Sequence, residues 1–267
     1  MEISTVSALS IVGMVVSLII SIVLPVCFCI YGCKKMKARL SSFFIGCGIF
    51  AVFAMILEQI LHIVVLTATG TKLTDNLFLY GLYGGLAAAV FEETGRFVAM
   101  KFFMKNQLDK KNAWMYGAGH GGVEAILLIG LTYISNIATA LMINSNQLDT
   151  ILGTLDESQK QATIETLSTL WTTPSYQFFL GGLERIFAIT IQISLSVFVY
   201  YGVKNSKKIF IALAMFLHFL VDFFSVILSD KIPVWGIEIV LCFMAAIIGV
   251  IAFKVYNIKE AEESENA

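Results

Sequence analysis

Charged residues are scarce in this chain of 267 residues: 14% are Asp, Glu, Lys or Arg, whereas 58% are hydrophobic. The mean hydropathy is +0.83. Such a composition excludes an ordinary soluble domain and indicates a helical protein that crosses the cell membrane several times. The net charge is −1 and no basic patch interleaved with aromatic residues occurs, so nucleic acid is not an expected partner. The lipid bilayer is therefore the expected surroundings.

Proline, cysteine and histidine are also rare, with three, five and three residues respectively. Among the prolines, only Pro25 falls inside an apolar run, where a kink is expected. The cysteines provide no disulfide framework. The cluster of Cys27, Cys29 and Cys33 could bind metal or carry a lipid, but the favoured interpretation is that the cysteines are small buried hydrophobic residues. The N-terminus lacks the positive region of a signal peptide and continues into a long apolar segment, so we expect the first span to be retained.

Seven apolar runs are long enough to cross a bilayer as helices. They cover about Val6–Tyr31, Ser41–Thr67, Leu77–Met104, Ala113–Ile143, Pro174–Tyr201, Ile209–Leu228 and Val234–Tyr256. The predicted fold class is therefore all-α, a polytopic membrane protein with a single helical transmembrane domain at residues 1–258. The acidic tail at residues 259–267 is expected to be disordered.

Basic residues gather in alternate loops and after the last span. By the positive-inside rule, this asymmetry places the N-terminus outside and the C-terminus in the cytoplasm. The long loop at residues 144–173 would then be external. Within it, Asp156 and Glu157 could cap a short helix with an apolar side at Ile164, Leu167, Leu170 and Trp171. This helix could lie in the membrane interface and cover a site, or it could be a passive surface helix.

The third span carries three charged residues, Glu92, Glu93 and Arg96, in the middle of its apolar run. Charges at membrane depth are costly and normally face a protein interior or a wet cavity. On a helix, Glu92 and Arg96 share a face as i,i+4 neighbours, while Glu93 meets Arg96 only as an i,i+3 neighbour. One carboxylate can therefore neutralise Arg96 and leave the other for chemistry. The plainer interpretation is a structural ion pair, which needs only one acid.

Two other spans carry polar residues at helical spacing. Tyr116, His120 and Glu124 follow one another at i,i+4 in the fourth span, and His218 and Asp222 do so in the sixth. Counted from the cytoplasmic ends at about 1.5 Å per residue, Glu92, His120 and His218 all lie roughly 12–15 Å deep. We therefore expect one acid and two imidazoles to share a level in the membrane.

Such a group of residues could hydrolyse an amide bond. Glu92 would act as the general base on water, His120 would orient the water or share its proton, and His218 would stabilise the oxyanion. Arg96 and Glu93 would hold these groups in place. This route requires no cofactor.

A zinc ion is the alternative. His120 and His218, with a carboxylate from Glu92, Glu124 or Asp222, would form a site with two histidines and one carboxylate, open to water at its remaining position. The sequence contains no His-Glu-x-x-His motif, so its signal for zinc is weak.

A second polar set falls in the outer half of the membrane by the same count. It comprises Glu58, Gln59 and His62 in the second span with Glu184 and Arg185 in the fifth. We expect Glu58 and Arg185 to form a structural pair or a wall of the substrate entrance. Gln192, deeper in the fifth span, could face the cavity.

These motifs resemble those of known intramembrane proteases. The Glu-Glu-x-x-Arg stretch at Glu92, the aromatic-x3-His at Tyr116 and the His-x3-Asp at His218 are similar to the CAAX-protease and bacteriocin-processing (CPBP) superfamily. The Gly-His-Gly-Gly-Val-Glu run and the Gly-Leu-Glu-Arg stretch at residues 182–185 resemble more closely its YhfC-type branch of proposed intramembrane metalloproteases.

The resemblance implies roles for the matching residues. It places the water-activating glutamate at Glu92 and the two motif histidines at His120 and His218. Two features depart from the superfamily: only two residues separate the glutamate pair from Arg96, and Asp222 stands where Asn is usual. An ionised aspartate cannot donate to an oxyanion, which favours an orienting or metal-binding role for Asp222.

Three classes of function remain open. The first is an intramembrane protease whose substrate is a membrane-embedded or membrane-proximal protein or peptide. The second is a transporter or proton relay, because buried acids and histidines also carry ions. The third is a non-catalytic immunity or maturation partner. The absence of a second copy of the motifs counts against a transporter built from inverted repeats, and the presence of all three candidate catalytic residues counts against a dead enzyme.

Overall fold

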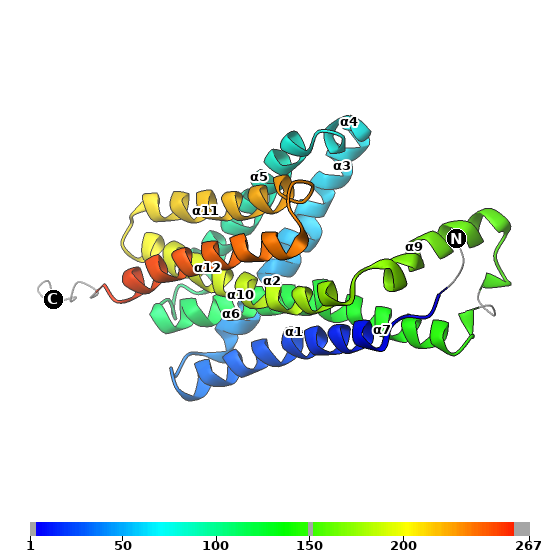
Figure 1. The fold of residues 1–267 in the computed structure, drawn as a ribbon. Coiled ribbons are helices and arrows are strands. Elements are labelled where there is room, and N and C mark those ends of the chain that lie inside the picture. Colours follow the sequence, from blue (N-terminus) through cyan, green and yellow to red (C-terminus); the bar gives the residue numbers. More distant parts are fainter. Residues whose placement is uncertain (1–3, 149–151, 259–267) are drawn as a thin grey trace, which may run out of the picture. The chain divides into compact units, whose positions relative to one another are not determined.

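The computed structural model describes residues 4–148 and 152–258, and these ranges contain helices and no strand (Figure 1). The expected acidic tail at residues 259–267 lies outside the described residues. The helices are α1 Ala8–Lys34, α2 Leu40–Val52, α3 Gln59–Thr69, α4 Thr71–Thr74, α5 Leu77–Val98, α6 Lys110–Ala125, α7 Leu131–Asn144, α9 Glu157–Thr172, α10 Ser175–Lys204, α11 Lys208–Ile227 and α12 Val234–Tyr256. The all-α prediction is confirmed.

Within the described residues, six helical runs are long and apolar enough to cross a membrane. They are Ala8–Lys34, Leu40–Thr69, Lys110–Asn144, Ser175–Lys204, Lys208–Ile227 and Val234–Tyr256. The seventh expected span corresponds to α5, which is long enough, but its charged residues lower its hydropathy. The chain is therefore a multi-pass membrane protein, close to the predicted seven spans. The direction in which it crosses the membrane stays a prediction.

Three of the long helical runs contain a π-helical segment that the sequence did not predict. These segments are η1 Phe53–Glu58, η2 Ala99–Phe103 and η3 Ile126–Gly130. Each lies in a run that also carries buried or partly buried acids. A π-helical turn accommodates an extra residue and changes which face the following side chains occupy, and such turns are frequent at functional sites.

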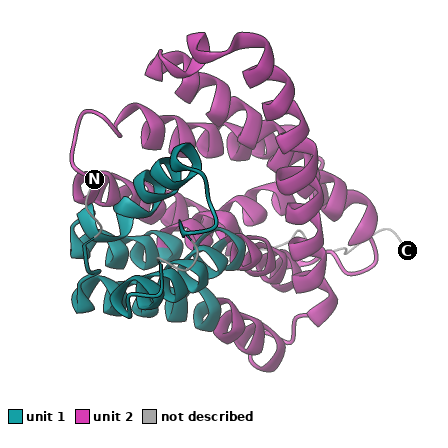
Figure 2. Ribbon diagram, turned by 90° about the vertical axis from the view of Figure 1, so that its right-hand side faces the viewer, with its two compact units in different colours: residues 1–24, 125–186 teal, residues 25–124, 187–267 magenta. Residues whose placement is uncertain are grey.

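Two compact units make up the chain (Figure 2). One unit comprises residues 1–24 and 125–186, and the other comprises residues 25–124 and 187–267. The boundary in α1 falls at Pro25, the one proline inside that helix. Since α1 and α10 continue from one unit into the other, the single domain expected at residues 1–258 stays a prediction.

The first unit contains the short helix that was expected in the long loop. Asp156 caps α9 by accepting a hydrogen bond from the backbone N–H of Gln159, whose side chain bonds back to the cap residue. Ile164 and Leu170 on this helix are buried in a hydrophobic cluster of the unit, and Leu167 and Trp171 pack against it. The apolar side of α9 is therefore covered by protein and is not left for the membrane interface.

The second unit is held together by close helix contacts at small residues. A Cβ atom on Gly85 of α5 would meet the backbone of Phe219 in α11, and one on Gly119 of α6 would meet the backbone of Phe43 in α2. Gly117 approaches the backbone of Ile193 in α10 in the same way. Small residues allow this approach, and close packing is the main attraction between helices in a bilayer. The contacts bring α5 against α11, and α6 against both α2 and α10.

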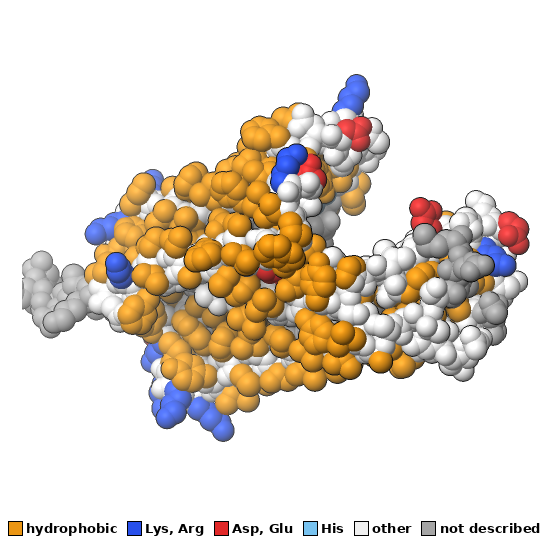
Figure 3. All heavy atoms as spheres, viewed as in Figure 1, with side chains coloured by type: hydrophobic (Ala, Val, Ile, Leu, Met, Phe, Trp, Pro, Cys, Tyr) orange, Lys and Arg blue, Asp and Glu red, His pale blue; other side chains and the backbone are white. Residues whose placement is uncertain are grey.

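The outer surface of the second unit is apolar. Phe216 of α11 is 56% exposed and Phe243 of α12 is 65% exposed. On the face shown in Figure 3, hydrophobic side chains cover the flanks of these two helices, and basic side chains lie at their ends near the C-terminus. This distribution suits helices whose flanks contact lipid and whose ends reach the interface.

The glycine contacts lead to a stability prediction. We expect Gly119→Ala to lower the free energy of unfolding by about 1–3 kcal/mol, because its Cβ would overlap the Phe43 carbonyl and force α6 away from α2. Gly48→Ala in α2 is the matched control, since no atom lies within 4 Å of its Cβ position. This control should be neutral or gain up to about 1 kcal/mol from helix propensity. Denaturant unfolding in detergent micelles measures both, and equal stabilities would contradict the close approach.

Candidate active site

The polar residues of the second unit converge from four helices. Glu92, Glu93 and Arg96 lie on α5, Tyr116, His120 and Glu124 on α6, Gln192 and Ser196 on α10, and His218 and Asp222 on α11. The structure thus brings together the acid and two imidazoles that were expected to share a level, with the polar residues that the sequence placed around them. Glycine contacts hold α5 against α11 and α6 against α10, and the hydrogen bonds of Arg96 join α5 to α10.

Glu92 occupies the centre of this group and is 8% exposed. Its Oε2 lies 2.8 Å from Nε2 of His120 and accepts a hydrogen bond of 3.1 Å from the side-chain amide of Gln192. Nε2 of His218 lies 3.9 Å from the same oxygen. One carboxylate oxygen therefore faces both imidazoles, which is the arrangement required of a group that exchanges protons with its neighbours.

Glu93 is the partner of Arg96. Its Oε2 lies 3.1 Å from Nε of Arg96, and both side chains are fully buried. Its other oxygen, Oε1, lies 2.8 Å from Nδ1 of His218. Of the two pairings that helix spacing allowed, the i,i+3 pair forms, which leaves Glu92 to face the histidines. Glu93 orients His218 so that its Nε2 is directed toward Glu92.

Arg96 ties α5 to α10. Its guanidinium donates to the Gln192 backbone carbonyl at 2.6 Å, to Oγ of Ser196 at 2.5 Å and to the side-chain oxygen of Gln192. The ring of Tyr116 lies 5.9 Å from its central carbon. A buried guanidinium is tolerated when its donors are matched in this way. Sequence analysis noted Gln192 only as a residue that could face the cavity and missed Ser196, whose i,i+4 spacing from Gln192 is the one available signal.

His120 lies between aromatic rings. The Phe50 ring meets it edge-on at 5.2 Å, and the Tyr116 ring lies 6.0 Å away. Among the described residues, neither Nδ1 of His120 nor the Tyr116 hydroxyl has a hydrogen-bond partner, although both are buried. These rings fix the imidazole plane, so that Nε2 is the nitrogen presented to the acids.

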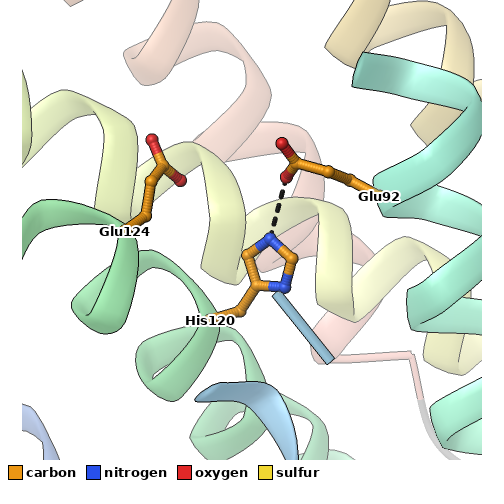
Figure 4. Close-up of side chains that lie close together, drawn as sticks. All are labelled: Glu92, His120 and Glu124. Carbon is orange, nitrogen blue, oxygen red and sulfur yellow. Dashed lines mark hydrogen bonds and ion pairs between the residues drawn. The ribbon is translucent and has the colours of Figure 1, made fainter. Parts of the chain in front are cut away.

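Glu124 completes a possible metal-binding group with Glu92 and His120. One ligand atom from each of the three residues lies within 4.8 Å of the others. Figure 4 shows both carboxylates near the Nε2 end of the His120 ring. Gln192 bridges the two acids, donating 3.0 Å to Glu124 as well as to Glu92. One imidazole and two carboxylates are donors that zinc accepts, so the residues fit this ion.

This group differs from the expected zinc ligands. His120 and Glu124 belong to it, but His218 and Asp222 do not. Nε2 of His218 instead lies 3.6 Å from Oδ2 of Asp222, whose side chain is 35% exposed. Glu92, which extends from α5 toward α6, is the third member of the group.

In the polar set that was expected in the outer half of the membrane, His62 contacts Glu58, and it also contacts Tyr83. Nε2 of His62 lies 3.2 Å from Oε1 of Glu58, and its Nδ1 lies 2.7 Å from the hydroxyl of Tyr83, a residue that sequence analysis did not single out. Glu58 is close enough to Glu92 for their charges to interact.

Arg185 is paired with its neighbour Glu184. The expected pair between Glu58 and Arg185 stays a prediction, because the two residues belong to different compact units.

The acids near the two imidazoles differ in their partners. Glu93 pairs with Arg96 and contacts His218, Glu92 lies beside His120, and Asp222 lies beside His218. Acids placed beside imidazoles can share protons with them, and the group formed by Glu92, His120 and Glu124 could also hold a cation.

Comparisons with known proteins identify the family of this chain. The sequence profile of the family described as "YhfC intramembrane metalloprotease" matches residues 20–255. The chain is 38% identical to "Uncharacterized membrane protein YhfC" of Bacillus subtilis (strain 168) over 246 residues, which cover 91% of this chain and 95% of that protein. No solved structure matches. On this evidence, the chain belongs to the YhfC intramembrane metalloprotease family.

Proposed function

We propose that this protein hydrolyses a peptide bond of a membrane-embedded or membrane-proximal substrate. The observation that carries the proposal is the position of Glu92, whose Oε2 faces Nε2 of His120 at 2.8 Å and Nε2 of His218 at 3.9 Å. An acid between two imidazoles in a largely buried site has the parts needed for acid–base catalysis on water. The family name supports the same reaction class.

Glu92 is the general base in this proposal. Its carboxylate takes a proton from the attacking water, and the bond from Gln192 holds the carboxylate in position during this step. His120, bonded to the same oxygen, accepts or returns that proton and delivers it to the leaving amine. No covalent intermediate with the chain is required, because water is the nucleophile.

His218 stabilises the oxyanion that forms on the substrate carbonyl. Nδ1 of His218 is held by Glu93 at 2.8 Å, and Arg96 fixes Glu93 in turn. This chain of contacts prepares Nε2 to donate a hydrogen bond without rearrangement, and preorganised donors of this kind contribute strongly to catalysis. Asp222, near the same nitrogen, sets the orientation of the ring.

Zinc fits the group formed by Glu92, His120 and Glu124. When bound there, the ion would supply Lewis-acid activation of water or of the carbonyl. In that case Glu124 and His120 would hold the ion, and Gln192 would orient the two carboxylates through its amide.

The substrate is best identified without assuming its sequence. Cells that express the wild-type protein or Glu92→Gln are compared by labelling new protein N-termini in their membranes and identifying them by mass spectrometry. Membrane peptides that are cut only in the presence of the wild type are then synthesised and tested with purified protein. Proton or ion flux through liposomes in the absence of any cleavage would favour the transporter alternative instead.

We predict that Glu92→Gln lowers the rate of peptide cleavage by about 10²–10⁴-fold, because an amide keeps the size of the side chain but cannot take up the proton. His120→Ala should cause a loss of similar size. Glu238→Gln is the matched control, since Glu238 is also buried but lies on α12, which contributes no residue to the site. Cleavage assays with the identified peptide measure all three. Full activity of Glu92→Gln would exclude this base.

The zinc site has a test that is independent of any substrate. Elemental analysis of the purified protein should find about one zinc per chain, because the three donor residues form one site. His120→Ala and Glu124→Gln should each lose it, whereas His62→Ala, a histidine outside the group, should retain it. Chelation should then abolish cleavage. Cleavage by a wild-type protein without metal would support the glutamate route alone.

The ion pair that holds His218 should also contribute to folding. Arg96→Met is expected to cost about 3–5 kcal/mol of unfolding free energy, because Glu93 is left buried without its guanidinium partner. Adding Glu93→Gln to Arg96→Met should recover part of this loss, since the carboxylate charge is removed. Denaturant unfolding of the wild type, the two single variants and the double variant gives the coupling energy, and additive effects would show that the two side chains do not interact.

A further inference from the structure

An apolar cavity of about 570 Å³ lies in the second unit, apart from the candidate active site. Aromatic and aliphatic side chains of four helices line it, among them Phe28 of α1, Trp114 of α6, Val197 of α10 and Phe253 of α12. Its volume falls within the range of sites that bind small molecules. Two of its rim residues are strongly exposed, Tyr31 by 52% and Phe253 by 68%, and they lie on helices apolar enough to span the membrane. The cavity therefore opens toward lipid.

A second cavity, of about 340 Å³, adjoins the first. Met36 and Tyr256 line both cavities. The second is otherwise lined by Asp109, Lys110 and Lys111 at the start of α6. Its lining therefore carries two positive charges and one negative charge, in contrast to the apolar lining of the first cavity.

Two of the three charged groups of this polar cavity are held in place. Asp109 accepts a 2.8 Å hydrogen bond from the backbone N–H of Asn112 at the start of α6. Lys110 donates to the Ile258 carbonyl at 2.7 Å and lies 5.9 Å from the Tyr256 ring, which fixes its ammonium group at the cavity. With Lys111, the lining carries one more positive charge than negative charge, which favours an anion.

We propose that the joined cavities bind an anionic glycerophospholipid. Its acyl chain fills the apolar cavity, and its phosphate meets Lys110 and Lys111. Basic pockets between membrane helices recognise acidic headgroups, and aromatic residues such as Trp114 and Tyr256 are typical of the interfacial level at which such headgroups lie. A basic cavity next to an apolar one matches a lipid, which has both a charged headgroup and an acyl chain. A soluble anion has no hydrocarbon part that would fill the larger cavity.

This lipid site would share a helix with the candidate active site. Ile193 and Val197 of α10 line the apolar cavity, while Gln192 and Ser196 of the same helix bond Arg96. The acyl chain would thus support one side of α10 while the ion-pair network fixes the other. The lipid proposal does not require hydrolytic activity, so the two proposals can fail separately.

The test is native mass spectrometry of the protein released from nanodiscs that contain equal amounts of phosphatidylglycerol and phosphatidylcholine. Wild type should retain phosphatidylglycerol preferentially. Lys110→Gln with Lys111→Gln should weaken its binding roughly 25-fold, at about five-fold for each basic side chain. Lys207→Gln with Lys208→Gln is the matched control. It removes two adjacent lysines at the start of α11, of which Lys207 also lies over a tyrosine ring. This variant should retain phosphatidylglycerol as the wild type does.

A second variant examines the acyl chain. Gly249→Leu directs a side chain into the apolar cavity, and its Cβ would make only ordinary contacts with Thr190 and Ser194, so the fold should be retained. It should reduce retention of the lipid. In protein that carries Trp171→Phe and Trp235→Phe, so that Trp114 is the remaining tryptophan, brominated phosphatidylglycerol should quench the fluorescence less when Gly249→Leu is added. Glycerol 1-phosphate, which has the headgroup without tails, should not displace the lipid.

Three results would overturn the proposal. Equal retention of the two lipids by wild type would indicate a groove that accepts any acyl chain. A preference that survives neutralisation of Lys110 and Lys111 would place the headgroup elsewhere. Displacement by glycerol 1-phosphate, with no effect of Gly249→Leu, would indicate a soluble-anion site.

Discussion

The buried ion pair between Arg96 and Glu93 is the interaction on which the candidate active site depends. Both side chains are fully buried, where an isolated charge would be prohibitive. The pair is tolerated because Arg96 also donates to α10 and Glu93 also bonds His218 of α11. The helices α5, α10 and α11 are thereby fixed relative to one another by one ion pair. The position of His218, and through it the surroundings of Glu92, follows from this arrangement.

Helix positions could be predicted from the sequence because membrane spans are long, apolar and bounded by polar residues. The convergence of Glu92, His120 and His218 could also be predicted, since the rise per residue of a helix is nearly constant and their three spans have recognisable ends. The rotation of each helix about its own axis could not be predicted from the sequence. It is set by contacts between helices, so the choice of Glu93 over Glu92 as the partner of Arg96 emerges only from the structure.

Other features left at most a weak signal in the sequence. Gln192 and Ser196 are neutral side chains in an apolar run, and their i,i+4 spacing puts them on one face of a helix without showing what that face contacts. The π-helical segments have no composition signature, yet η1 ends at Glu58 and η3 begins two residues after Glu124. From the sequence alone, the apolar side of α9 could face either the membrane interface or other parts of the protein. Only the hydrophobic cluster of the first unit shows that protein covers it.

The position of Glu92 connects the structure of the site with its chemistry. Its Oε2 faces Nε2 of His120 and Nε2 of His218, so one carboxylate oxygen can exchange protons with either ring. If the group formed by Glu92, His120 and Glu124 held a cation, His120 would be a ligand and could not carry a proton, and His218 would be the imidazole left to act on substrate. The support of His218 by Glu93 is separate from that group and serves either route. The two routes therefore differ in the role of His120 and agree in the roles of Glu93 and His218.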